Sequence, residues 1–176
     1  MRIIAGQYRH RLLDFPKNAP ELRPTKDMVK EALFSIIGER VIGVQFLDLY
    51  AGVGSIGLEA VSRGAREAVF IDQDTQFIQR NIQKLGCLNV RVYRNDVPRA
   101  LKILAARKEK FEIIFLDPPY QQGLLAVSAC FAILKPAGLL IAETATDHAP
   151  ELPPDVHIAD ERRYGSAKIL FLEKNF

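Results

Sequence analysis

The sequence predicts an α/β fold in which helices cover both faces of a mostly parallel, seven-stranded sheet. From about position 44 onward, short apolar runs alternate with segments that have the apolar period of a helix. Short, continuously apolar runs are typical of strands buried on both faces. Strand and helix in repetition require right-handed crossover connections, and these produce a parallel sheet.

Five strands are expected first, at residues 45–50, 67–72, 90–93, 111–116 and 139–143. Helices are expected between them, near residues 55–63, 74–85, 97–107 and 122–134. The turn residues agree with these bounds. Gly64 and Gly86 follow helical segments as C-terminal stops, and residues 136–138 predict a turn before the fifth strand.

The two ends of the chain differ from this repeating pattern. Runs at 156–163 and 168–172 are separated by Gly165, which predicts an antiparallel hairpin that closes the sheet, so that only the last strand is antiparallel. Near the N-terminus, runs at 2–5 and 11–15 predict a small hairpin across Gly6, and Thr25 is expected to cap a helix that runs to about Ile37. We therefore divide the chain into an N-terminal extension, residues 1–40, and a main domain, residues 41–176.

Composition limits the class of protein. The chain has 176 residues, of which 48% are hydrophobic and 26% charged, as in ordinary globular domains. No run approaches the roughly 18 apolar residues of a membrane span, and no apolar leader is present, so we expect a soluble, cytoplasmic protein. We also expect it to be a monomer. Cys87 and Cys130 lack the CxxC spacing of a metal site, so neither a metal nor a disulfide is expected.

Basic residues are concentrated at the N-terminus. Residues 1–30 carry seven Lys or Arg against three Asp or Glu, which leaves the rest of a chain of net charge +3 about neutral. A basic arm on a neutral domain indicates a polyanionic partner, although a solvated surface is the alternative. The candidate RNA-binding residues are Arg2, Arg9, Arg11 and Arg23.

The first strand-to-helix turn, residues 51–57, is the candidate cofactor loop. It fits the pattern G-x-G-x-x-G from Gly52, and Asp72 lies 20 positions after that glycine, as in dinucleotide-binding domains. Asp48, four residues before Gly52, points to a different ligand. A carboxylate suits the ammonium and sulfonium groups of S-adenosylmethionine but gains nothing beside a pyrophosphate. The residues expected to bind this cofactor are Asp48, Tyr50, Gly52, Gly54, Asp72 and Asp96.

Acidic residues after the second and third strands fit an adenosine. Asp72 is placed to accept hydrogen bonds from both ribose hydroxyls, with Asp74 as a rival, and Asp96 is placed to accept one from the adenine amine. Helix capping is the alternative role for Asp74 and for Asp96.

The segment Asp117-Pro118-Pro119-Tyr120 follows the fourth strand at the same edge of the sheet. Two prolines stiffen the backbone and remove amide donors, which leaves an acceptor-rich site. Two fixed acceptors can orient a planar amine so that its lone pair faces a methyl group, and Tyr120 offers a surface for stacking a flipped base. We expect Asp117, Pro118 and Tyr120 to be the catalytic residues; a strand-terminating turn with a core tyrosine is the alternative.

The acid at position 117 favours guanine as the target base. Guanine presents two adjacent donors, N1–H and the N2 amine, whereas adenine and cytosine have a lone pair beside their amine that a carboxylate repels. Adenine-N6 enzymes also use Asp-Pro-Pro-Tyr, so adenine stays open as the alternative target base.

The chain resembles the bacterial 16S rRNA guanine-N2-methyltransferase family of RsmD type. The resemblance rests on residues 2–9, residues 22–25 (Leu-Arg-Pro-Thr), residues 48–60, residues 117–120 and the pair Tyr164-Gly165. It implies a Rossmann-like class I methyltransferase that modifies a guanine of small-subunit rRNA, in assembled or nearly assembled subunits. Tyr120 stands where the family usually has Phe, and Tyr8 stands near a usual Trp.

Three other functions remain as alternatives. An NAD-dependent oxidoreductase would use the glycine loop and Asp72 but neither Asp-Pro-Pro-Tyr nor the basic arm. A noncatalytic RNA-binding domain gives no reason for two acid-rich loops. An adenine-N6 methyltransferase of DNA or RNA keeps the chemistry, but a DNA enzyme would need more than 43 residues of target-recognition sequence before the first core strand.

Overall fold

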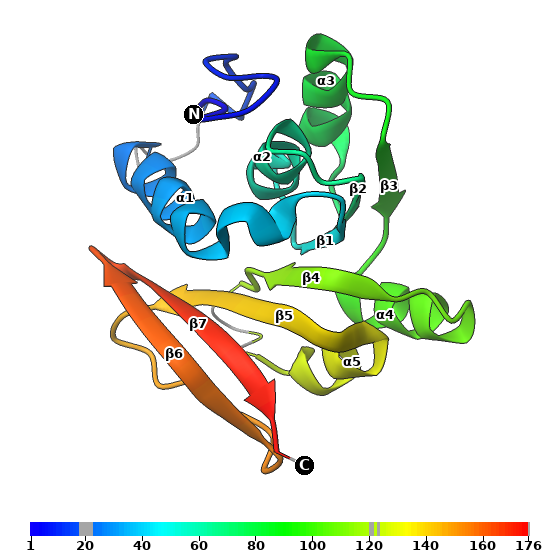
Figure 1. Ribbon diagram of the computed structural model, residues 1–176, viewed down its shortest axis with the longest axis vertical. Helices are drawn as coiled ribbons and strands as arrows, with labels where there is room; N and C mark the ends of the chain where they lie inside the picture. The colour runs from blue at the N-terminus through cyan, green and yellow to red at the C-terminus, as the bar shows by residue number, and fades with distance from the viewer. Residues whose placement is uncertain (18–22, 120–121, 123, 176) are drawn as a thin grey trace.

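The computed structural model describes residues 1–17, 23–119, 122 and 124–175, with only the backbone for residues 23–25. It contains a seven-stranded sheet of order β3-β2-β1-β4-β5-β7-β6 (Figure 1). The strands β1 to β5 are parallel, and β7 is antiparallel to both of its neighbours, as expected. The strands are β1 (Gln45–Leu49), β2 (Glu67–Asp72), β3 (Val90–Arg94), β4 (Phe111–Leu116), β5 (Leu134–Ala145), β6 (Val156–Tyr164) and β7 (Ala167–Lys174).

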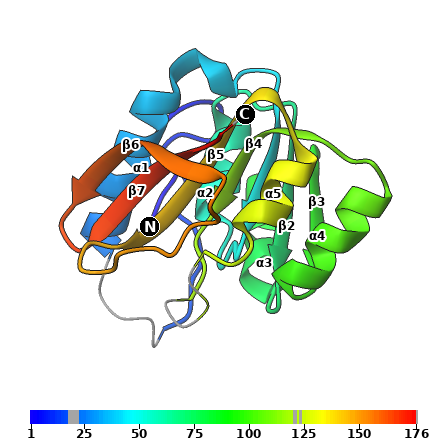
Figure 2. The same cartoon turned by 90° about the horizontal axis from the view of Figure 1, so that it is seen from below.

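Helices cover both faces of this sheet (Figures 1 and 2). The helices are α1 (Arg23–Ile37), the short 3-10 helix η1 (Gly38–Val41), α2 (Ser55–Ser62), α3 (Gln76–Leu85), α4 (Val97–Ala106) and α5 (Val127–Ile133). Residues of α1, α2 and α3 form one core with the sheet, and residues of α4 and α5 form the other.

The side chains of the parallel strands alternate between these two cores. Phe46 packs in the first core and Leu47 in the second, and both are fully buried. Burial on both faces explains why these strands appear in the sequence as continuous apolar runs rather than alternating ones.

The N-terminal hairpin forms, but with a single antiparallel bridge between Arg2 and Leu12. Gly6 lies against α2 with a φ of +82°, and a Cβ at this position would lie 1.7 Å from the carbonyl oxygen of Ser62. Only glycine allows so close a contact in this backbone region. Ile3 and Leu13 from this segment are buried in the first core.

Three of the expected boundaries are wrong. The helix α1 begins at Arg23, so Thr25 is inside it and does not cap it. The fifth strand begins at Leu134, and the residues expected to form a turn instead make an irregularity within it, where Ala137 has a φ of +60° and the register with β4 shifts. The preceding helix is correspondingly short and starts only at Val127. Among the described residues, no helix is both long and apolar enough to span a membrane.

Candidate active site

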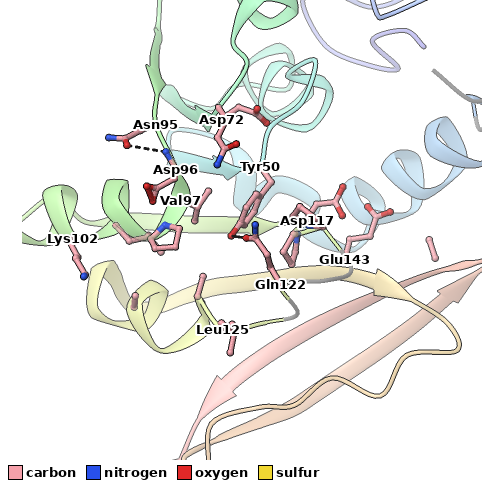
Figure 3. A pocket seen from close by; sticks show the side chains of 18 of the residues that line it. Tyr50, Asp72, Asn95, Asp96, Val97, Lys102, Asp117, Gln122, Leu125 and Glu143 are labelled. Carbon is pink, nitrogen blue, oxygen red and sulfur yellow. Dashed lines mark hydrogen bonds between the residues drawn. The ribbon is translucent and has the colours of Figure 1, made fainter. Parts of the chain in front are cut away.

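The carboxyl ends of the parallel strands meet at one edge of the sheet and surround a cavity of about 1000 Å³ (Figure 3). Its wall includes Tyr50 after β1, Asp72 at the end of β2, Asp96 after β3, Asp117 after β4 and Glu143 on β5. A smaller cavity of about 270 Å³ shares Tyr50, Asp117 and Glu143 and is also lined by residues of the glycine loop and by Met1 and Pro16 of the N-terminal segment. The two acid-rich loops that the sequence predicts therefore lie at one site.

The glycine loop combines left-handed backbone with very close packing. Gly52 and Gly54 have φ values of +58° and +81°, and Tyr50, which is not a glycine, has a φ of +58°. At Gly57 the requirement is space, since a Cβ there would lie 2.3 Å from the ring of Phe70 on β2. The loop thus turns sharply from β1 into α2 and holds that helix against the sheet.

Asp48 is buried at the end of β1 and anchors this loop. Its Oδ2 accepts a hydrogen bond of 2.8 Å from the amide of Gly57. Burial raises the pKa of the Asp48 carboxyl well above its usual value, and the Gly57 hydrogen bond opposes this shift. Asp48 also lines the smaller cavity beside Gly52, so the acid is both an anchor of the loop and a wall of the site.

Asp72 and Asp74 have separate positions. Asp72 lines the large cavity, and its two oxygens accept hydrogen bonds from the amides of Gly52 (2.8 Å) and Asp74 (2.9 Å). Asp74 is not part of the cavity wall; its Oδ1 accepts a bond of 3.0 Å from the amide of Gln76 at the start of α3. Of the two rivals for the ribose, only Asp72 therefore faces the cavity.

Asp96 fits both of the roles expected for it. Its Oδ1 accepts a hydrogen bond of 2.9 Å from the amide of Arg99 and so caps α4. The residue also lines the large cavity beside the apolar side chains of Val97 and Leu101. One oxygen caps the helix, and a carboxylate has further acceptor capacity for a ligand.

Asp117 and Pro118 line the large cavity at the end of β4. Asp117 is half-buried, and burial raises the pKa of its carboxyl to about 6, against the opposing effect of the Lys26 ammonium. Tyr50 connects this loop to the glycine loop, because its hydroxyl donates a 2.9 Å hydrogen bond to Oε1 of Gln122. Tyr120, the third expected catalytic residue, lies outside the described residues.

Two charged residues of the site were missed by the sequence analysis. Glu143 on β5 lines both cavities, and so does Lys26, which comes from α1. A signal for Glu143 was present, since it was the last residue of the expected fifth strand and would therefore reach the same edge as Asp117. For Lys26 there was none, because the packing of α1 over this edge is a tertiary feature.

The N-terminal arginines are placed at the surface. Arg2, Arg9 and Arg11 are exposed, and Arg11 donates a 2.6 Å hydrogen bond to the carbonyl of Lys84. The side chain of Arg23 is not among those described. The backbone of this segment is fixed by Glu59 of α2, whose carboxylate accepts hydrogen bonds from the amides of Ile4 (2.8 Å) and Ala5 (3.0 Å).

The strand order, the glycine loop with acids at the strand ends, and the Asp-Pro-Pro turn together define a Rossmann-like class I methyltransferase. Residues 1–173 match the family model described as "Conserved hypothetical protein 95". The chain belongs to this family, which confirms the resemblance to RsmD-type enzymes.

Relatives of known name agree with this assignment. A Bacillus subtilis protein named "Putative rRNA methyltransferase YlbH" is 36% identical over 183 residues, which cover 99% of each chain. The ribosomal RNA small subunit methyltransferase D of Escherichia coli is 41% identical over 128 residues, which cover 71% of this chain and 63% of that protein.

Solved structures show the same fold. The structure of "Putative methyltransferase yhhF from Escherichia coli" superimposes with a TM-score of 0.81 at 32% identity and covers 99% of this chain and 98% of that one. The 16S rRNA N2 G1207 methyltransferase RsmC of Thermus thermophilus, in complex with AdoMet and guanosine, gives a TM-score of 0.66 at 25% identity over 90% of this chain and 45% of that one. These neighbours are methyltransferases, which argues against the oxidoreductase alternative.

Proposed function

We propose that this enzyme transfers the methyl group of S-adenosylmethionine to the exocyclic N2 of a guanine in 16S ribosomal RNA. One observation carries the proposal: Asp72 and Asp96, expected to hold the cofactor, line the same cavity as Asp117 and Pro118, and Asp48 lines the adjoining smaller cavity, which also contains Asp117. The names of the relatives support the RNA substrate, and the AdoMet and guanosine bound by the Thermus thermophilus neighbour support the pairing of cofactor and base.

The residues present fit S-adenosylmethionine. Asp72 would hold the ribose hydroxyls, and Asp96 the adenine amine against an apolar wall, while Asp48, Tyr50 and Gly52 would surround the methionine part. Gly54, also expected to bind the cofactor, lines neither cavity and lies against Leu58 and Phe70. When bound, the cofactor supplies an electrophilic methyl group on a sulfonium. The acids at this edge favour that positive charge.

The chain's own contribution to the reaction is orientation and charge stabilisation. Asp117 and the carbonyl of Pro118 would accept hydrogen bonds from the target amine, so that its lone pair is directed toward the methyl carbon. The ionised Asp117 also stabilises the positive charge that develops on the nitrogen. We assign the stacking of the flipped base to Tyr120. No covalent intermediate is needed, and the buried Cys87 and Cys130 take no part.

The N-terminal extension, residues 1–40, is proposed to hold the RNA, with the main domain formed by residues 41–176. Arg2, Arg9, Arg11 and Arg23 would contact phosphates, which position the substrate without selecting its sequence. We propose that the enzyme works as a monomer in the cytoplasm; light scattering after gel filtration would report the mass of one chain, and a dimer mass would contradict it.

The test of the function compares three substrates. Unmethylated small ribosomal subunits, naked 16S rRNA and DNA are incubated with isotope-labelled S-adenosylmethionine, and the products are digested and identified by mass spectrometry. We expect label in N2-methylguanosine from the RNA substrates. Recovery of N6-methyladenosine would overturn the guanine assignment.

A further inference from the structure

Glu143 is a second carboxyl group beside Asp117, and the mechanism above gives it no role. The parallel strands β4 and β5 pair Leu116 with Ala142, so Asp117 and Glu143 follow at the same level on neighbouring strands. Side chains at matched positions of adjacent strands point to the same face. Both residues line both cavities, and their carboxyl groups lie next to each other in Figure 3.

The two carboxyl groups have little to compensate their charge. Within the described part of the chain, neither side chain makes a hydrogen bond or an ion pair. The charged groups that face Glu143 there are Asp117 from β4, Asp48 from β1 and Lys26 from α1. Two adjacent, half-buried carboxylates with one ammonium nearby cannot both ionise at low cost.

One proton therefore stays on the pair near neutral pH. Burial and the charge of Asp117 raise the pKa of Glu143 to about 8, and burial raises the pKa of Asp117 to about 6. The pair thus shares one proton between one ionised carboxylate and one neutral carboxyl, and we assign the proton to Glu143, where the charge of Asp117 adds to the effect of burial. An ionised carboxylate only accepts hydrogen bonds, whereas a neutral carboxyl can also donate one.

This arrangement complements the edge of one base. Guanine carries an acceptor, O6, beside two donors, N1–H and the N2 amine. Asp117 supplies acceptors for the two donors, which leaves O6 in need of a donor. Adenine and cytosine present an amine at the equivalent position, so neither offers this order of groups.

We propose that Glu143 is a specificity-determining residue, which donates a hydrogen bond from its neutral carboxyl to O6 of the target guanine while Asp117 accepts from N1–H and the N2 amine. The inference rests on the proposed function, because it assumes that guanine occupies this cavity. It adds a recognition contact that no other residue of the mechanism supplies.

Nucleoside binding tests the contact directly. Guanosine and 6-thioguanosine, whose sulfur is a poor acceptor at the O6 position, are titrated by calorimetry into protein saturated with S-adenosylhomocysteine. The wild type should prefer guanosine, and Glu143→Gln, whose amide still donates, should keep that preference. Glu143→Met fills similar space without a donor and should lose about tenfold in the ratio of the two affinities. Glu151→Gln, at an exposed position, is the matched control.

The pH dependence gives a second measurement that does not need the Met variant to fold. The donor is lost as Glu143 ionises, so the wild type's affinity for guanosine should fall by about fourfold between pH 7.0 and 8.5. Glu143→Gln cannot ionise and should show no such fall over this interval. Any ionisation of the nucleoside itself affects both proteins equally and cancels in the comparison.

A failure of the role of Glu143 and a failure of the proposed function would give different results in these experiments. A guanosine affinity that rises with pH in the wild type, or equal losses in the Gln and Met variants, would overturn the role of Glu143 even where the wild type still forms N2-methylguanosine. If free nucleosides bind too weakly, the same variants are compared by kcat/KM on unmethylated small subunits, where Gln should retain and Met should lose activity. Formation of N6-methyladenosine by the wild type would instead contradict the proposed function.

Discussion

Five acidic residues at one edge of the sheet differ in how many hydrogen bonds their carboxyl groups already accept from the protein. Asp48 is buried on the amide of Gly57, while Asp72 and Asp96 each accept backbone amide hydrogen bonds and keep further acceptor capacity toward the cavity. Asp117 and Glu143 have no hydrogen-bond partner among the described residues, so they are the acids available for a substrate.

The role of Asp117 predicts a loss of turnover without loss of cofactor binding. In the proposed mechanism Asp117 accepts a hydrogen bond from the amine and stabilises its developing charge, so Asp117→Ala should lower kcat by roughly 10²- to 10³-fold. Calorimetry with S-adenosylhomocysteine should give a nearly unchanged affinity. The exposed Asp147→Ala is the control. Loss of cofactor binding in Asp117→Ala would mean that this loop belongs to the cofactor site and not to the target site.

At the scale of elements, the sequence predicts the order of strands and helices well because local patterns determine it. Strands such as β1 are apolar on both faces, and the turn at 51–57 shows its glycines directly. Features that depend on distant contacts were not predictable. The irregularity near Ala137 in β5 arises from the shifted register with β4, and the role of Gly57 arises from Phe70 on the next strand.

The contact between α2 and β2 predicts that Gly57→Ala destabilises the fold. The added Cβ would lie 2.3 Å and 2.7 Å from two ring carbons of Phe70 and 3.1 Å from Oδ2 of Asp48. Overpacking of this kind costs typically 1–3 kcal/mol, which urea unfolding followed by circular dichroism would measure. Shortening the neighbour in Gly57→Ala/Phe70→Leu should recover part of the loss relative to the two single variants. Purely additive effects would show that the ring does not limit position 57.

The attachment of the N-terminal segment to α2 also depends on one residue. Glu59 is fully buried, pairs with Arg63 at 2.7 Å and Lys30 at 3.6 Å, and accepts the amides of Ile4 and Ala5. It stands in the helix expected at residues 55–63, but nothing in the sequence indicates that two of its partners, Ile4 and Ala5, lie more than 50 residues upstream. A buried glutamate with these partners connects the N-terminal extension to α2.

Glu59→Gln should loosen that connection. The amide leaves the nearly inaccessible Lys30 ammonium without its nearest buried countercharge, and breaking a buried pair costs about 3 kcal/mol or more. Hydrogen exchange should show faster exchange at the amides of Ile4 and Ala5, together with a lower urea midpoint. Glu31→Gln, exposed on α1, should change neither. Unchanged protection at Ile4 and Ala5 would show that other contacts hold the segment.

For the molecule as a whole, exposed basic residues lie both near the edge of the sheet that carries the two cavities and at the opposite edge. The basic arm lies beside the site, since Met1, Phe15 and Pro16 line the smaller cavity. Exposed basic residues also occur at the far edge, where the parallel strands begin. Arg66 directly precedes β2, and Arg107 and Lys108 lie between α4 and β4. The net charge of +3 cannot distinguish these two surfaces, because it does not say where on the molecule the charged residues lie.

A comparison of these two surfaces tests where RNA binds. Replacing Arg2, Arg9 and Arg11 together by Gln removes three exposed charges from the arm, so KM for unmethylated small subunits should rise while kcat stays near that of the wild type. Each lost phosphate contact makes the salt dependence shallower, by about 0.7 to 0.9 in the slope of log K against log salt, or about 2 to 3 for all three. The matched triple replacement of Arg66, Arg107 and Lys108 removes the same charge from the far edge and should leave the slope unchanged. If both triple variants shift the slope equally, the RNA responds to overall charge, and the arm has no special role in holding it.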